Sequence, residues 1–188
     1  EQFGVRTQMF LGTKSSGRCN AFITEANAER TFATSLGAAL ELTADDLKPE
    51  QFQGWDYFHI EGYLVQNQEL ISSAVHMAKA AGCITSLDMA SYNVVESNNA
   101  FLHNLADRYI DIIFANESEA KAFTGVDDPH DALIELSKYC YVAVVKVGKD
   151  GSWVRSGEEE HFIEAWPAEP VDATGAGDTY AAGFLYAH

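Results

Sequence analysis

The sequence predicts an α/β fold built on a mostly parallel sheet, and two observations support this prediction. From Asp56 onward, short apolar runs alternate with longer segments of helical period, a rhythm that is typical of βαβ units. The 188 residues are 47% hydrophobic and 12% aromatic, which is the composition of a globular chain with one sizeable core. Because no internal repeat or Pro/Gly-rich linker interrupts the sequence, we expect a single domain over residues 1–188.

The expected strands of the sheet lie near 56–61, 83–88, 110–114 and 141–147. The expected helices between them cover 69–81, 98–108 and 131–139. In the first helix, Leu70, Ala74 and Met77 share one face, and Gly82 follows as a stop signal. Since crossovers between parallel strands are right-handed, the carboxyl ends of the strands meet at one sheet edge, where open α/β sheets bind ligands.

Both flanks of this region read as β-hairpins. Near the N-terminus, residues 18–35 alternate β-forming and polar side chains around a polar turn at 25–27, which predicts a small hairpin at a sheet edge or in a lid. Near the other end, residues 152–155 and 161–165 flank the acidic run 156–160. We expect that run to be a solvated turn at the tip of a second hairpin.

Charge and cysteine usage limit the function classes. With 12 basic and 28 acidic side chains, the formal charge of −16 argues against nucleic-acid and membrane partners. An anionic substrate must then be held locally, by backbone N–H groups, a helix N-terminus or bound cations. The cysteines Cys19, Cys83 and Cys140 form no C-x-x-C pair, so we expect neither a zinc site nor disulfides, and a cytoplasmic location. The first residues read like the middle of a protein, which suggests a fragment.

A segment near the C-terminus carries the strongest chemical signal. The sequence Asp-Ala-Thr-Gly-Ala-Gly-Asp at 172–178 precedes a helix-compatible run at 179–187. The first turn of a helix has unpaired N–H groups, and small residues let a phosphate approach them. Asp178 could accept a proton from an attacking hydroxyl beside that anion site. Alternatively, Asp178 only complements the helix dipole and the glycines only make a turn.

Other nucleotide-binding motifs fit less well. Tyr180 replaces the third glycine of G-x-G-x-x-G, and no segment matches the P-loop pattern. Asn116 and Glu119 follow an expected strand and could contact phosphate and Mg²⁺, or form a simple capping box. Asp88 ends another strand at the same edge, where it could face a ligand or cap the next segment.

In order along the chain, Asn116-x-x-Glu119, Lys146-x-Gly148-x-x-Gly151 and the 172–178 segment resemble the motifs of the ribokinase/PfkB family of carbohydrate and nucleoside kinases. The segments 16–19, 29–31, 36–38 and 61–64 look like its branch of sugar and adenosine kinases. The resemblance implies a three-layer ribokinase-like fold, with helices on both faces of the sheet. It also implies that the chain lacks the N-terminal part and the extreme C-terminus of such kinases.

Carried over by motif, the resemblance implies a role for each matching residue. Asp178 would be the base, and the anion hole would be lined by Gly175, Ala176 and Gly177. ATP would be contacted by Asn116, Lys146, Gly148 and Gly151. Glu119 would help to hold Mg²⁺, and the residues matching a monovalent-cation site, usually for K⁺, are Asp172 and Thr174.

The sequence therefore predicts an ATP-dependent kinase that phosphorylates a hydroxyl of a sugar or of a nucleoside such as adenosine. In such kinases an exposed β lid can also serve as a homodimer surface. Three alternatives stay open: a catalytically silent nucleotide- or sugar-binding protein, a dinucleotide-dependent oxidoreductase, and a purely structural α/β module. The segment by which these kinases recognise most of the acceptor, a glycine-rich N-terminal stretch, does not occur in the chain.

Overall fold

The computed structural model of the protein describes residues 4–23, 30–168 and 174–188. The chain forms two compact units, Glu1–Leu47 and Lys48–His188. That residues 1–188 form a single domain stays a prediction.

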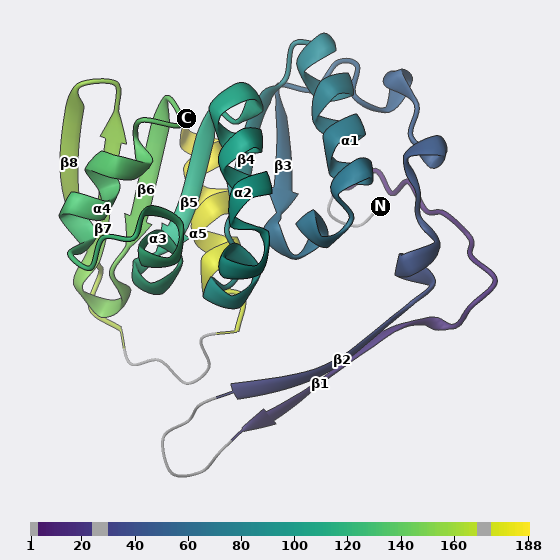
Figure 1. The fold of residues 1–188 in the computed structure, drawn as a ribbon, viewed down its shortest axis with the longest axis horizontal. Coiled ribbons are helices and arrows are strands. Elements are labelled where there is room, and N and C mark those ends of the chain that lie inside the picture. Colours follow the sequence, from purple (N-terminus) through teal and green to yellow (C-terminus); the bar gives the residue numbers. More distant parts are fainter. Residues whose placement is uncertain (1–3, 24–29, 169–173) are drawn as a thin grey trace. The chain divides into compact units, whose positions relative to one another are not determined.

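The first unit contains the small hairpin. Strands β1 (Ser16–Ile23) and β2 (Arg30–Gly37) pair antiparallel (Figure 1), with Asn20 opposite Ala33. This confirms the hairpin predicted near the N-terminus, while its expected turn at 25–27 lies outside the described residues. Short 3₁₀ turns follow: η1 (Ala38–Glu41) and η2 (Ala44–Asp46).

The second unit is built on a sheet that has six strands within the described residues. In spatial order they are β3 (Tyr57–Glu61), β4 (Ile84–Asp88), β5 (Ile112–Asn116), β6 (Val142–Lys146), β7 (Gly151–Ser156) and β8 (Glu159–Glu164). The pairs from β3 to β6 are parallel, and the pairs β6–β7 and β7–β8 are antiparallel. The four predicted parallel strands are thus confirmed, with ends shifted by one or two residues.

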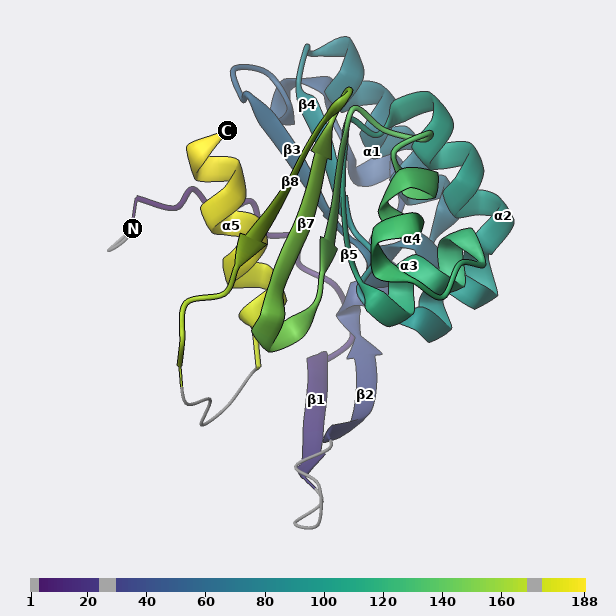
Figure 2. The ribbon, with the colours of Figure 1, turned by 90° about the vertical axis from the view of Figure 1, so that its left-hand side faces the viewer.

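The helices form the outer layers. They are α1 (Gln68–Ala80), α2 (Tyr92–Tyr109), α3 (Glu117–Thr124), α4 (Pro129–Leu136) and α5 (Ala176–Ala187). Figure 2 shows α5 on one face of the sheet and the other four helices on the opposite face. The three-layer ribokinase-like fold is therefore confirmed. A further 3₁₀ turn, η4 (Gly62–Gln66), connects β3 to α1.

Helix α2 begins earlier than its apolar pattern predicts. The expected start was at residue 98, but Ser91 caps the helix by accepting a bond from the Val94 N–H at 3.4 Å. At Asn98 the backbone leaves helical geometry, and its side-chain amide donates to the Val94 carbonyl at 3.0 Å. This kink interrupts the period, which explains why only the second half reads as a helix in the sequence.

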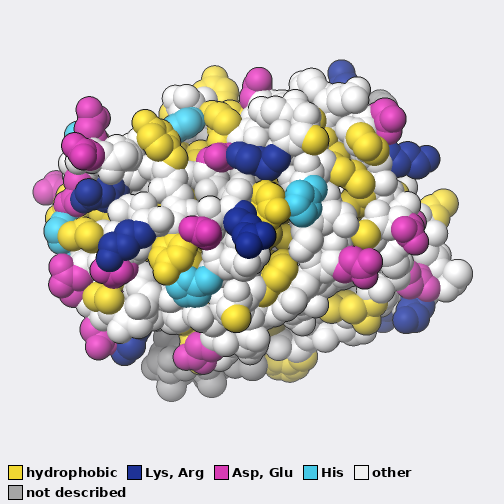
Figure 3. All heavy atoms as spheres, turned by 45° about the horizontal axis from the view of Figure 1, so that its top comes forward, with side chains coloured by type: hydrophobic (Ala, Val, Ile, Leu, Met, Phe, Trp, Pro, Cys, Tyr) yellow, Lys and Arg dark blue, Asp and Glu magenta, His cyan; other side chains and the backbone are white. Residues whose placement is uncertain are grey.

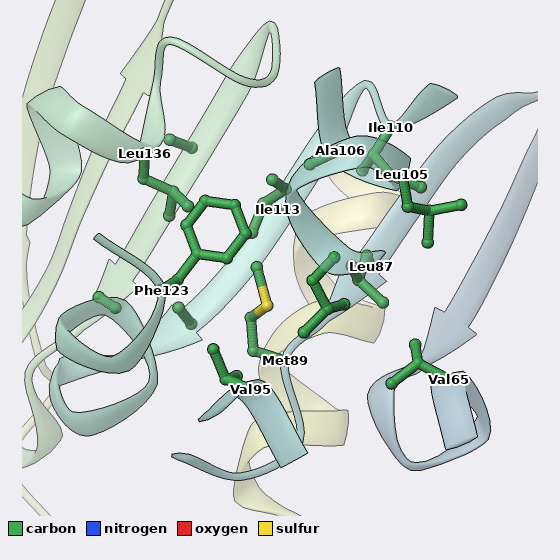
Figure 4. Packing of buried hydrophobic residues seen from close by; sticks show 14 of the residues in the cluster. Val65, Leu87, Met89, Val95, Leu105, Ala106, Ile110, Ile113, Phe123 and Leu136 are labelled. Carbon is green, nitrogen blue, oxygen red and sulfur yellow. The ribbon is translucent and has the colours of Figure 1, made fainter. Parts of the chain in front are cut away.

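The face covered by α1 to α4 holds the main core. Figure 4 shows Phe123 of α3, Leu136 of α4 and Met89 gathered over the central strands with Ile113. These side chains are at most 3% exposed. Burying a side chain of this size contributes about 1.5–3 kcal/mol, so this face supplies most of the apolar stabilisation of the second unit.

The hairpin β7–β8 differs from its prediction at the tip. Glu159 and Glu160 belong to β8, so only the start of the acidic run forms the turn. Glu160 contacts the His130 ring at 2.5 Å and accepts a bond from Arg155 at 3.2 Å. The expectation that the whole run is a solvated turn was wrong, because cross-strand pairing and the contacts of Glu160 with His130 and Arg155 hold its second half in the strand.

Charges of both signs are interspersed on the surface. Figure 3 shows one face, on which Lys and Arg side chains lie singly or in small groups between Asp and Glu side chains. Among the residues that the structure describes, no helix combines the length and apolar character needed to cross a bilayer.

Candidate active site

Each of the four parallel strands ends on a polar residue. Their last residues are Glu61, Asp88, Asn116 and Lys146. Side chains alternate between the two faces of a strand, so Asn116 shares a face with Phe114, which packs toward α5. By the same alternation Lys146 shares a face with Val144. The sequence thus places a polar rim at the carboxyl edge of the sheet, on the side that α5 covers.

An ion pair crosses this rim from β6 to β4. The Lys146 Nζ donates to Asp88 Oδ2 at 2.8 Å, and the two side chains are only 16% and 10% exposed. The other oxygen of Asp88 accepts a bond from the Ala90 N–H at 2.9 Å. The capping expectation for Asp88 is therefore met, and the same carboxylate pairs with Lys146 at the sheet edge. That it faces a ligand stays a prediction.

Asn116 and Glu119 form a capping box at the start of α3. Asn116 Oδ1 accepts from the Glu119 N–H at 2.9 Å, and Glu119 Oε2 accepts from the Asn116 N–H at 2.8 Å. The Asn116 amide also donates to Glu119 Oε1 at 2.7 Å. Burial raises the pKa of Glu119, and the charge of Asp88 raises it further, whereas the hydrogen bonds from Asn116 act in the opposite direction. The capping alternative is thus realised, with the carboxyl group still at the carboxyl edge of the sheet.

Helix α5 begins at the same edge. Gly175 is its N-cap in the left-handed region (φ 76°), and the Thr179 N–H donates to the Gly175 carbonyl at 2.9 Å. No side chain of the described residues caps this end, which leaves the first N–H groups of the helix directed outward. A Cβ placed on Gly177 would lie 3.3 Å from the Lys146 Nζ. The helix start and the ion pair are therefore neighbours.

Asp178 stands in the first turn of α5 and interacts with the rim. Burial raises the pKa of Glu61, and the charges of Asp178 and Asp88 together with a hydrogen bond to Asp178 raise it further. Burial lowers the pKa of His59, whereas the same two aspartates act in the opposite direction. The rim and the first turn of α5 thus form one electrostatic cluster.

Glu61 is not among the site residues that the sequence motifs predict. It is the last residue of β3, in the segment 61–64 that takes part in the family resemblance. Its position at the end of an expected strand is the same signal that singles out Asp88. The signal that could have identified Glu61 is therefore its position at the end of an expected strand.

Four other predicted residues remain, three of which lie within the described part of the chain. Gly148 begins a short 3₁₀ turn, η5 (Gly148–Asp150), with φ 58° and open space around its Cα. Gly151 has φ 132°, and an added Cβ would lie 2.0 Å from the Ile163 carbonyl oxygen, so the β7–β8 pairing itself requires glycine there. Thr174 is exposed just before α5, and Asp172 lies outside the described residues.

The arrangement can hold an anion and move a proton. The amides at the start of α5 attract negative charge, and Asp178 beside them can accept a proton. Carboxyl groups outnumber cations in the described cluster, which contains Glu61, Asp88, Glu119 and Asp178 around Lys146. Such an oxygen-rich donor set fits Mg²⁺, which prefers carboxylate and water oxygens.

Solved structures share this fold. The crystal structure of the adenosine kinase from Sinorhizobium meliloti is 34% identical and superposes with a TM-score of 0.83 over 90% of this chain and 53% of that one. A protein described as a probable sugar kinase from Rhizobium etli CFN 42 is 31% identical, with a TM-score of 0.84 and the same two coverages.

A curated relative in sequence is also a kinase. The ribokinase of Staphylococcus aureus (strain COL) is 25% identical over 192 residues, which cover 96% of this chain and 60% of that protein. The chain therefore spans a little more than half the length of these proteins. The sequence model of the pfkB family of carbohydrate kinases matches residues 1–188, so the chain belongs to this family.

Proposed function

We propose that the protein is an ATP-dependent phosphotransferase that transfers the γ-phosphoryl group to a hydroxyl of a sugar or nucleoside. The observation that carries this proposal is the position of Asp178, in the first turn of α5 and within the polar rim. The kinases to which the chain is similar act on acceptors of both classes, as their names state. Adenosine is one candidate acceptor, because the adenosine kinase is among the structures that share the fold.

In this proposal each residue of the α5 start has a task. Asp178 removes the proton from the acceptor hydroxyl, whose oxygen then attacks the γ-phosphorus. The new O–P bond forms as the bond to the bridging oxygen breaks, and ADP leaves with that electron pair. The amides lining the anion hole, those of Gly175, Ala176 and Gly177, stabilise the charge on the phosphoryl oxygens.

The remaining rim residues would bind the nucleotide and its cation. Asn116 and Lys146 would donate to phosphate oxygens, and Glu119 would hold Mg²⁺ directly or through water. The chemistry that bound Mg²⁺ supplies is neutralisation of phosphate charge. Gly148 leaves open space in which a nucleotide could approach the backbone. Asp172 and Thr174 are the residues we assign to a K⁺ ion.

The test is the variant Asp178→Asn in the full-length protein. General-base catalysis contributes about 10²–10⁴-fold to a rate, so kcat should fall by that factor while the Kd for MgATP stays within about twofold. Asp107→Asn is the matched control, because it removes an exposed carboxylate from α2 and should leave kcat unchanged. Retained turnover in Asp178→Asn would remove the base assignment.

Two further measurements separate the alternatives. Release of ADP by the wild-type protein is assayed with a panel of neutral sugars and nucleosides, and no release with any acceptor would favour a silent binding protein. A fluorescence titration with NADH is expected to show no binding. Tight NADH binding without MgATP binding would instead favour an oxidoreductase.

A further inference from the structure

Lys146 is the cation around which the candidate site is organised. In the part of the chain that the structure describes, its charge acts on three side chains at the carboxyl edge, those of His59, Glu61 and Glu119. Its ammonium also lies against the first turn of α5, since a Cβ on Gly177 would approach it to 3.3 Å. A negatively charged phosphoryl group in the anion hole would therefore meet Lys146.

A specific contact fixes the ammonium of Lys146 in this position. A lysine has a flexible four-carbon stem and loses much rotamer entropy when it is fixed. The side chain of Lys146 does not extend freely beyond β6; its Nζ pairs with Asp88 of β4 at 2.8 Å. Strand β5 lies between these two strands, so the side chains of Lys146 and Asp88 together span about 9–10 Å of sheet to meet. Asp88 determines that direction.

Asp88 is itself held firmly. Its Oδ1 accepts from the Ala90 N–H, and Ala90 has the left-handed φ of 62° that this turn imposes. On the other side, Gly62 lets β3 approach so closely that an added Cβ would lie 2.5 Å from the Asp88 carbonyl oxygen. The carboxylate therefore occupies one place, and the ammonium bound to it does so as well.

We propose that Asp88 is a positioning residue, which holds the Lys146 ammonium beside the amide of Gly177 so that it contacts the phosphoryl group during transfer. This inference rests on the proposed function. An ammonium has three donors, and the bond to Asp88 uses one of them. Lys146 can thus keep Asp88 as a partner while it donates to the phosphoryl oxygens. The rival role for Asp88 is direct contact with the divalent cation.

A double-mutant cycle separates the two roles. Lys146→Met should lower kcat on the order of 10²-fold, the usual cost of losing one donor to a developing charge. Asp88→Asn should lower kcat at least about 10-fold, because it misplaces the ammonium, while its amide oxygen can still accept from Ala90. In the Lys146→Met background, Asp88→Asn should then change kcat less than about twofold.

Two outcomes would overturn the proposal. One is an equal loss from Asp88→Asn in both backgrounds, which would mean that Asp88 acts without Lys146. The other is a shifted Mg²⁺ activation midpoint in Asp88→Asn, which would mean that the carboxylate acts on the cation. Lys146→Arg is the conservative variant and should restore the sensitivity to Asp88→Asn. If Asp88→Asn does not fold, Asp88→Ser serves in the same cycle.

A second measurement does not depend on catalysis. In the ligand-free protein, Lys146 is acylated with an amine-reactive reagent, and the extent is read by mass spectrometry. Asp88→Asn should speed labelling of Lys146 several-fold, while labelling of the exposed Lys138 stays the same. An unchanged rate at Lys146 would refute the pairing whatever the activity. Absence of phosphoryl transfer in the wild-type protein would refute only the proposed function.

Discussion

The substitution Gly62→Ala tests how tightly β3 and β4 must approach to build the polar rim. Gly62 opens η4 directly after β3, and an added Cβ would lie 2.5 Å from the Asp88 carbonyl oxygen and 2.8 Å from the carbonyl carbon and oxygen of Met89. These atoms belong to the backbone and have no rotamer to change. Since ordinary contact begins at 3.4 Å, the Asp88 carbonyl would have to recede by about 0.9 Å, the difference between 3.4 and 2.5 Å.

The expected cost follows from this overlap. Inserting a methyl group into a filled site costs about 1–3 kcal/mol. Because the φ of Gly62 is not positive, alanine tolerates the backbone and recovers about 0.4–1 kcal/mol through the unfolded chain. A net loss of about 1–2 kcal/mol remains. For a chain of this length, it should lower the Tm by about 2–8 °C.

Thermal and urea unfolding, followed by circular dichroism, measure this change. The matched control is Gly183→Ala in the middle of α5, where an added Cβ would meet no atom within 4 Å. There alanine should raise stability by about 0.5–1 kcal/mol, through helix propensity. The two variants thus have opposite expected signs. A Gly62→Ala protein as stable as the wild type would refute the close approach of β3 and β4.

Three further predictions concern titratable groups. Burial and the nearby aspartates raise the pKa of Glu61 above 4.5, so its contribution to stability is full below pH 4.5 and is lost as the pH rises through the folded pKa. Glu61→Gln should therefore raise the Tm more at pH 8 than at pH 4, and a pH-independent difference would contradict this. Burial alone would raise the pKa of Asp111, but bonds from the Lys79 ammonium and from Thr85 hold it below 3.8. Asp111→Asn should cost about 1–2 kcal/mol at pH 7, and chemical unfolding should show that the loss shrinks below pH 3.8. Burial raises the pKa of the Cys140 thiol to about 12, so a thiol-reactive chromophore should label the exposed Cys19 but not Cys140 before unfolding.

The architecture could be predicted from the sequence because its signals are local. Each parallel strand is a short apolar run, and all four appear within a residue or two of their expected ends. The start of α2 was missed because Ser91 and the kink at Asn98 interrupt the helical period. A period reports the face that a segment buries, and it fails where one segment changes face.

The candidate site is only partly visible in the sequence. The motifs carry Asp178, Asn116 and Glu119, which the fold brings to one edge, while their roles stay predictions. Neither the ion pair between Lys146 and Asp88 nor the contact of Glu61 with Asp178 could be predicted. Both contacts depend on strand order and register. Asp88 and Lys146, for example, are 58 positions apart, and they meet because the sheet places β4 and β6 on either side of β5 with their carboxyl ends at the same edge.

The position of Asp178 depends in turn on how α5 packs against the sheet. Phe114, which is fully buried, meets the rings of Tyr180 and Phe184 edge-on at 6.3 and 5.3 Å. The Tyr180 hydroxyl is in addition 2.8 Å from the Ser152 Oγ of β7. On this face, the apolar middle of the sheet holds the body of the helix, and the polar rim receives its first turn. Packing two turns along the helix therefore sets the geometry of the proposed anion hole, because a helix that shifts on Phe114 carries Gly177 and Asp178 away from Lys146.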